Sequence, residues 1–97
     1  MVAYAVFDIE ILDPVAWQEY VRLATVASEK YGPRPVMITT GTSESLEGDW
    51  APHRLVVLQF DSVEEAKRWY YSPEYQEASA ARWKAAKTKA VIVESIS

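Results

Sequence analysis

The stretch from Leu46 to Tyr75, LEGDWAPHRLVVLQFDSVEEAKRWYYSPEY, joins the most apolar segment of the chain to its clearest helix start. Alternate side chains of the segment Arg54 to Phe60 fall into two apolar sets: Leu55 and Val57 on one face, and Val56, Leu58 and Phe60 on the other. Because a strand that is apolar on both faces is covered on both, this pattern predicts a central strand of a sheet.

The residues that follow this strand predict two consecutive helices. Ser62 suits an N-cap, and Glu65 three residues later completes a capping box. Ser72-Pro73 interrupts the helical pattern, and proline is tolerated only in a first turn, so Ser72 is expected to cap a second helix. We therefore predict helices over Val63 to Tyr71 and Pro73 to Lys87.

The composition is that of one ordinary globular domain spanning residues 1–97. Half of the residues are apolar (49%) and a quarter are charged (25%). The net charge of −4 argues against a nucleic-acid partner, which would need a concentrated basic face. No segment approaches the roughly 20 apolar residues that span a membrane, and no signal peptide is recognisable, so we expect a cytoplasmic protein without a membrane partner.

The counts of cysteine and histidine limit the possible chemistry. The chain has no cysteine, which excludes disulfides, thiolate metal sites and a cysteine nucleophile. The single histidine, His53, excludes a multi-histidine metal site within one chain and disfavours a self-contained Ser-His-Asp triad. We expect neither a metal nor another cofactor.

Three further segments complete the predicted topology. Alternation predicts a strand over Tyr4 to Leu12, and Asp13-Pro14 starts an amphipathic helix that ends at Gly32. Val36 to Leu46 begins like a strand, but Gly41 suggests a bulge or an irregular edge, and Lys89 to Ile96 reads as a last strand. The order β-α-β-β-α-β predicts an α+β, ferredoxin-like fold, with a four-stranded antiparallel sheet and all helices on one face.

Such a fold leaves one face of the sheet uncovered. That face should carry Val6, with Val57 or Leu58 from the central strand, and is too apolar for a stable monomer. Two such sheets packed face to face would bury it, so we expect an isologous homodimer.

Motifs along nearly the whole chain resemble the domain-of-unknown-function 1330 family, and the SPEYQ segment after a Trp-Tyr pair is the most specific of them. The segments that carry the resemblance are Asp13-Pro14, Trp17, Tyr20, Lys30-Tyr31-Gly32, Leu46 to Trp50, Arg54 to Leu58, Trp69-Tyr70, Ser72 to Gln76 and Val93-Glu94. The family looks like a branch of the dimeric α/β-barrel superfamily, which includes antibiotic-biosynthesis and haem-degrading monooxygenases and muconolactone isomerases. The resemblance implies a dimer with a pocket between sheet and helices, and it implies no particular reaction.

The sequence also departs from that family. Members typically show Tyr-Gly-Gly and then Arg-Gly-Gly, whereas this chain has Tyr31-Gly32-Pro33 and Thr39-Thr40-Gly41. The missing arginine puts in doubt any anion site that it supports in relatives. The helix position that holds an arginine in the family is still arginine here, Arg82.

Two groups of ionisable side chains are candidates for acid–base catalysis. Asp8 and Glu10 lie two residues apart on one strand face, a pair that can do acid–base work, although a hydrated or salt-bridged pair without a histidine partner is the favoured interpretation. His53 could act as a general base, although a lone histidine at a strand start is more often a surface residue.

The helices carry many aromatic residues, most of which must be core in so small a domain. An aromatic-walled pocket with few polar groups would suit a planar organic ligand. The candidate ligand-binding residues are Trp17, Tyr20, His53, Arg54, Trp69 and Arg82. Two functions follow as hypotheses. The first is a small-molecule-binding protein or a cofactor-independent enzyme, such as a monooxygenase or isomerase acting on an aromatic compound, and the second is a stable, non-enzymatic dimeric module with a binding or purely structural role.

Overall fold

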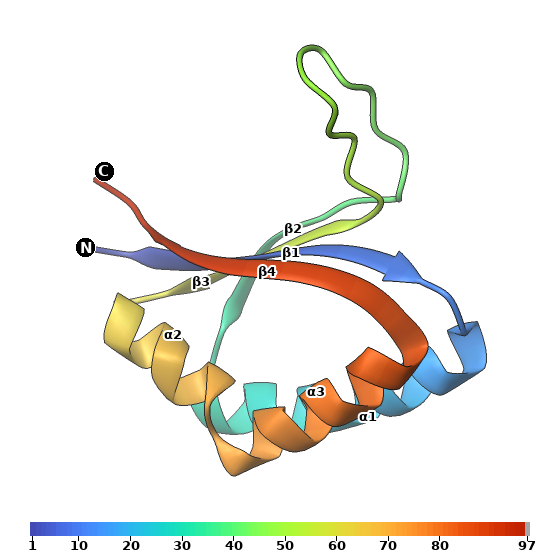
Figure 1. Cartoon of the computed structure of the whole chain (residues 1–97). Coiled ribbons are helices and arrows are strands. Elements are labelled where there is room, and N and C mark those ends of the chain that lie inside the picture. Colours follow the sequence, from blue (N-terminus) through green and yellow to red (C-terminus); the bar gives the residue numbers. More distant parts are fainter. Residues whose placement is uncertain (97) are drawn as a thin grey trace.

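Four strands form one antiparallel sheet in the order β2-β3-β1-β4, and three helices cover one of its faces (Figure 1). The computed structural model describes residues 1–96. Its elements in chain order are β1 (Ala3–Ile11), α1 (Pro14–Tyr31), β2 (Arg34–Ile38), β3 (Leu55–Phe60), α2 (Val63–Tyr70), α3 (Pro73–Ala85) and β4 (Ala86–Glu94). The ferredoxin-like α+β prediction and the central position of β3 are confirmed.

The helix boundaries follow from the capping residues that the sequence indicates. Asp13 accepts hydrogen bonds from the backbone N–H groups of the first turn of α1, and Gly32 ends that helix in the left-handed region at φ 66°. Ser62 accepts from the Glu65 N–H at the start of α2. Ser72 is buried, donates to the Trp69 carbonyl and accepts from the Tyr75 N–H, so it fixes the break between α2 and α3.

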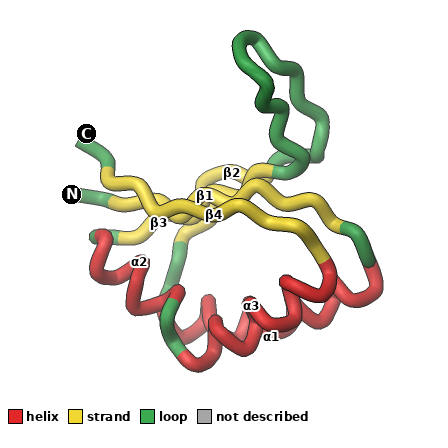
Figure 2. The backbone as a smooth tube through the Cα atoms, viewed as in Figure 1, coloured by secondary structure: helices red, strands yellow, loops and turns green. Residues whose placement is uncertain are grey.

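The helices lie against one face of the sheet, and the other face is open except for the loop that rises from it (Figure 2). The strand register gives these two faces different side chains. The helix-side face carries Ala5, Phe7 and Ile9 of β1, all buried. On the open face, Val6 of β1 lies between Val57 of β3 and Val91 of β4. Of the two residues proposed for this face from β3, Val57 lies there and Leu58 packs against the helix-side core.

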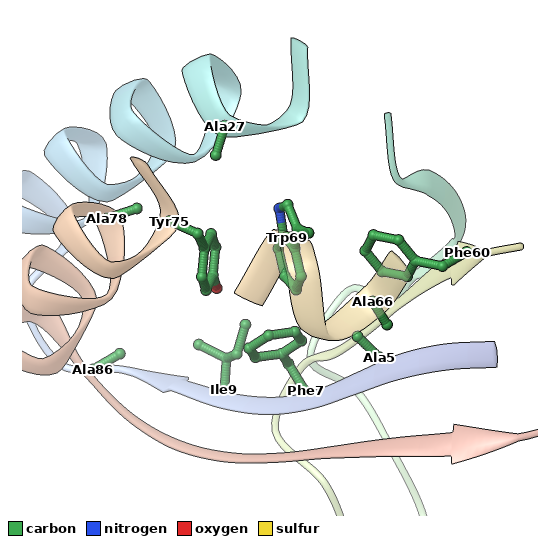
Figure 3. Close-up of a cluster of buried hydrophobic side chains, with 10 residues drawn as sticks. All are labelled: Ala5, Phe7, Ile9, Ala27, Phe60, Ala66, Trp69, Tyr75, Ala78 and Ala86. Atoms are coloured by element: carbon green, nitrogen blue, oxygen red, sulfur yellow. The ribbon is translucent and has the colours of Figure 1, made fainter. Parts of the chain in front are cut away.

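The core between sheet and helices is built around aromatic rings (Figure 3). The Trp69 ring centroid lies 4.0 Å from that of Tyr75, 5.2 Å from Phe60 and 6.1 Å from Phe7. Each large aromatic side chain buries roughly 150–250 Å², so these four rings dominate the apolar area removed from water.

The predicted bounds of three elements, α3, β4 and β2, are wrong. The last strand starts at Ala86 rather than Lys89, and α3 ends at Ala85 rather than Lys87, because Ala86 already has extended backbone (φ −155°, ψ 157°) and pairs with Ile11. The second strand is Arg34–Ile38 rather than Val36 to Leu46, with its register shift between Pro35 and Met37 rather than at Gly41. Proline is tolerated in β2 because that strand lies at the sheet edge.

Residues 39–54 form a long loop that projects from the open side of the sheet, opposite the helices (Figure 1). At its base the Thr39 hydroxyl accepts a hydrogen bond from the Leu55 N–H at 2.9 Å, and Ser43 donates to the Pro52 carbonyl at 2.6 Å. The loop is therefore tied to the start of β3 while its tip reaches into solvent.

Candidate functional site

The structure separates the six predicted ligand-binding residues into two regions. Trp17, Tyr20, Trp69 and Arg82 lie on the helix side of the sheet, whereas His53 lies at the base of the loop on the open face. Arg54 precedes β3, and its carbonyl accepts a hydrogen bond from the Ile9 N–H at 2.8 Å. These six residues therefore do not line one common site.

The first region, which we call the interior site, is the group formed by Phe7, Tyr20, Tyr75, Ser79 and Arg82. Helical spacing on α3 directs Tyr75, Ser79 and Arg82 toward the core, and all three are buried. The Arg82 side chain is 2% exposed, and its guanidinium carbon lies 5.5 Å from the centroid of the Phe7 ring. A permanently charged group thus lies inside the apolar layer between sheet and helices.

Arg82 has little polar compensation within the described residues. Its Nη2 donates to the Ser79 hydroxyl at 3.4 Å, its Nε has no hydrogen-bond partner, and no carboxylate of residues 1–96 lies within 4.0 Å of it. Burying a charge without a counter-charge is costly, so this arrangement is unfavourable for the protein alone.

Two tyrosines complete the interior site. Their hydroxyl oxygens, on Tyr20 of α1 and Tyr75 of α3, lie 2.8 Å apart and share a hydrogen bond. Burial raises the pKa of both phenols, and the Arg82 charge opposes that shift in each. Both phenols therefore remain protonated and can serve as neutral hydrogen-bonding groups beside the guanidinium.

A cavity of about 240 Å³ opens next to the interior site, between β4 and the end of α2. Its floor is formed by Ala5 and Phe7 of β1 with Ala90 and Ile92 of β4, and its wall by Tyr70 and Tyr71. Phe7 belongs to both the cavity and the interior site, because the Arg82 guanidinium approaches its ring.

The remaining helix-side candidates have packing partners of their own. Trp69 lies in the centre of the core, and Trp17 packs against Tyr20 with ring centroids 4.6 Å apart. Trp83 is exposed on the outer side of α3. The spacing of Tyr70 and Tyr71 in the sequence does not distinguish a core ring from a cavity-lining ring, and only the folded chain shows both of them at the cavity.

The second region, the open-face site, is a hollow of about 350 Å³ between the loop and strands β1 and β4. Asp8 lies at its base with a side chain only 12% exposed, and it accepts hydrogen bonds from the Trp50 indole N–H at 2.9 Å and the His53 backbone N–H at 3.0 Å. Lys87 and Lys89 of β4 line the opposite wall.

The structure places His53 between the two carboxylates of β1, which corrects the expectation that they lack a histidine partner. His53 Nδ1 lies 4.0 Å from Asp8 Oδ1, and its Nε2 lies 3.7 Å from Glu10 Oε2. The imidazole is 61% exposed, as a surface residue should be. The partner was missed because the loop, 45 residues away in sequence from Asp8, folds back over β1.

Within residues 1–96, no group of three or more His, Asp or Glu side chains is arranged to hold a metal ion. No helix of that range is both long and apolar enough to cross a membrane.

The chain is a ferredoxin-like α+β protein, since its four-stranded antiparallel sheet has helices on one face and its elements follow the order β-α-β-β-α-β. Residues 2–96 match the model of the family described as "Domain of unknown function (DUF1330)". The chain belongs to this family, and the resemblance drawn from its motifs is confirmed.

Solved structures with the same fold share little sequence with the chain. A protein of unknown function from Rhodopseudomonas palustris is 17% identical, with a TM-score of 0.74 over 99% of this chain and 83% of its own. A dimeric ferredoxin-like protein of unknown function from Jannaschia sp. CCS1 is 12% identical, with a TM-score of 0.64 over 98% of this chain and 100% of its own.

SnoaB, a cofactor-independent oxygenase from Streptomyces nogalater, is 11% identical, with a TM-score of 0.58 over 99% of this chain and 93% of its own. No curated protein sequence matches the chain. At these identities the likeness shows the fold alone, and function has to be argued from the sites.

Proposed function

We propose that the protein is a homodimer that binds a small organic molecule in the cavity between the sheet and the helices. The observation that carries this proposal is the cavity of about 240 Å³ whose floor and wall are apolar and aromatic, with Phe7, Tyr70 and Tyr71 presenting rings to it. Small-molecule sites are typically concave, mostly apolar and furnished with a few polar groups.

The dimensions of the cavity favour a compact, planar ligand. Cavities for drug-sized ligands measure roughly 300–1,000 Å³, so a cavity of about 240 Å³ suits a molecule of one or two rings. Aromatic side chains prefer offset-stacked or edge-to-face partners, which a planar ring satisfies.

The open face of the sheet supports the dimeric part of the proposal. Val91 of β4 is 56% exposed in the single chain, and Val6 and Val57 extend the same apolar strip across β1 and β3. Contiguous apolar surface of this kind marks an interaction site. A second copy is the favoured occupant because the Jannaschia protein of the same fold is described as dimeric, and an isologous pairing would cover both strips at once.

Native mass spectrometry of the protein purified from cells under mild conditions tests both parts of the proposal. A dimer with extra bound mass supports the proposal and reveals the ligand class. Ala90→Trp, which fills the cavity, should abolish the extra mass, whereas Val26→Trp on the exposed side of α1 should retain it. A monomer at micromolar concentration would overturn the dimer, and an extra mass that survives Ala90→Trp would place the ligand elsewhere.

The open-face site favours a second candidate function, that of a cofactor-independent monooxygenase or isomerase acting on an aromatic compound. His53 lies 3.7 Å from one carboxylate and 4.0 Å from another at the edge of a 350 Å³ hollow, which is the environment of a general base. The likeness to SnoaB, an oxygenase, is compatible with this candidate. Turnover of any identified ligand that is unchanged in His53→Gln would rule His53 out as the base.

A further inference from the structure

We infer that the ligand of the cavity is a carboxylate, and that Arg82 is the residue that binds its charged group. The inference rests on the proposed function and adds the chemical class of the ligand. Arg82 differs from the paired cations of the molecule in its burial and in its lack of a carboxylate partner.

Paired cations of this chain lie at the surface. Three arginines form ion pairs there: Arg22 with Glu19, Arg34 with Asp61 and Arg68 with Glu65. Lys30 pairs with Glu74 in the same way. Among residues 1–96, Arg82 is the one buried cation, and no carboxylate lies within 4.0 Å of it. The chain has 14 acidic residues for 10 basic ones, so acidic residues are not scarce.

The contacts that Arg82 does make are weaker than its burial requires. The Phe7 ring at 5.5 Å supplies a cation–π contact, the Ser79 hydroxyl accepts a long hydrogen bond at 3.4 Å, and the neutral Tyr75 phenol also interacts with the guanidinium. These uncharged partners are small compared with the effective penalty for taking a guanidinium out of water. A buried cation without a counter-charge needs an explanation, and the anionic group of a ligand supplies one.

The free donors of Arg82 match one class of group. A guanidinium presents five N–H donors in a rigid planar fork, and the structure leaves Nε without a partner. Such a fork binds a carboxylate through two parallel charge-assisted hydrogen bonds. The protonated hydroxyl pair of Tyr20 and Tyr75 lies beside the guanidinium and extends the polar end of the site.

Phe7 is the residue that the interior site and the cavity share. One side chain, Phe7, lines the cavity floor and also receives the Arg82 guanidinium on its ring. An aromatic carboxylate meets both requirements, since its ring can pack on Phe7 and Tyr70 while its anionic group pairs with Arg82.

Calorimetric titration of the full-length protein with 2-naphthoate and with 2-naphthamide, its neutral counterpart of the same shape, tests the inference. We expect the wild type to bind the carboxylate at least about tenfold more tightly than the amide. Arg82→Met should weaken 2-naphthoate by about tenfold or more and change 2-naphthamide by less than about threefold. Arg82→Lys, which keeps the charge without the fork, should fall between the two.

The ligand-free stability of the same variants provides a second readout. Replacing an uncompensated buried charge by an apolar side chain of similar length should leave the melting temperature of Arg82→Met equal to or above that of the wild type. Arg68→Met, which removes an exposed arginine of α2, is the matched control and should leave both probes unaffected. If Arg82→Met melts at a lower temperature than the wild type, Arg82 is a structural residue and the inference is overturned.

The outcomes also separate this inference from the proposed function. Equal binding of both probes to the wild type would overturn the carboxylate and leave the cavity as a neutral-ligand site. Binding of neither probe would overturn the proposed site for compact aromatic ligands together with the inference. Because the probe pair is compared first on the wild type, the result stands even if a variant fails to fold.

Discussion

The two faces of the same four strands satisfy their polar groups differently. On the open face, Asp8 is nearly buried but accepts two hydrogen bonds, from the Trp50 indole and the His53 backbone. On the helix side, Arg82 Nε, Trp69 Nε1 and Thr88 Oγ1 are buried without partners among residues 1–96. Native proteins contain few buried polar atoms without hydrogen-bond partners, and each of them needs a physical explanation. The buried polar groups without partners among the described residues thus lie on the helix side, whereas the open face carries exposed apolar side chains such as Val91.

The largest effect is expected from removing the central ring of the helix-side core. Trp69→Ala should lower the free energy of unfolding by about 3–5 kcal/mol, since it deletes a fully buried ring and leaves a cavity. Because small domains have only about 5–15 kcal/mol of stability, urea denaturation should show a large fall in the midpoint.

Trp83→Ala is the matched control, because it removes the same side chain from the exposed side of α3. Trp83 is 61% exposed, and we expect a change within about 0.5 kcal/mol. Comparable losses in the two variants would contradict the assignment of stability to the helix-side layer.

The second-largest effect is expected on the affinity of the proposed dimer, which would form through the open face of the sheet. Val91→Asp introduces a charge at the most exposed position of the apolar strip formed by Val57, Val6 and Val91, and should weaken the proposed dimer by about 2 kcal/mol or more, which is a rise of roughly 30-fold in its dissociation constant. Analytical ultracentrifugation across a concentration series measures the shift. Val26→Asp, at an exposed position of α1, should leave the association unchanged; equal weakening by both would place the interface on the helices.

Much of the fold was predictable from the sequence because local signals and burial patterns agreed. Asp13, Ser62 and Ser72 all cap helices as their positions indicate, and alternation assigned the two faces of β1 and β3. The boundary at Ala86 was missed because the pairing of Ala86 with Ile11, a long-range contact, overrides the helical propensity of the segment around it.

The candidate sites were less predictable, because they depend on contacts between distant segments. His53 and Arg82 were identified by residue type, but nothing in the sequence shows that one faces Asp8 across 45 residues and the other lacks a counter-charge. The unpaired state of a buried group is a property of everything around it. Only the folded chain reveals it.

A smaller effect should appear in alkaline solution. Burial holds the pKa of Tyr20 and Tyr75 above the ordinary tyrosine value of about 10. Above about pH 10 the unfolded state therefore holds fewer protons than the folded state, and stability falls as pH rises, by up to about 1.4 kcal/mol per pH unit for each tyrosine. Below about pH 10 both states keep these protons, and no such slope is expected.

Tyr75→Phe tests this expectation through urea titrations at pH 8, 10 and 11. At pH 8 it should cost about 0.5–1.5 kcal/mol, because it removes the hydrogen bond to Tyr20. Between pH 10 and 11 its stability should fall less steeply than that of the wild type. The exposed Lys30, whose pKa the Glu74 carboxylate raises, titrates in both proteins and cancels in the comparison. Parallel slopes would contradict the burial of these phenols.

The smallest effect on global stability should come from the Asp8 contacts that hold the loop. Asp8→Ala removes the acceptor of the Trp50 indole and the His53 backbone, so the loop should open more often while the unfolding free energy changes by less than about 1 kcal/mol. Cleavage by a glutamate-specific protease within residues 39–54, where Glu44 and Glu47 lie, should accelerate by roughly tenfold. Glu10→Ala is the matched control, because Glu10 approaches only the His53 imidazole and holds no backbone group of the loop. Equal cleavage rates in both variants would show that the Asp8 hydrogen bonds do not hold the loop. The open face would then not differ from the helix side in how its polar groups stabilise the structure.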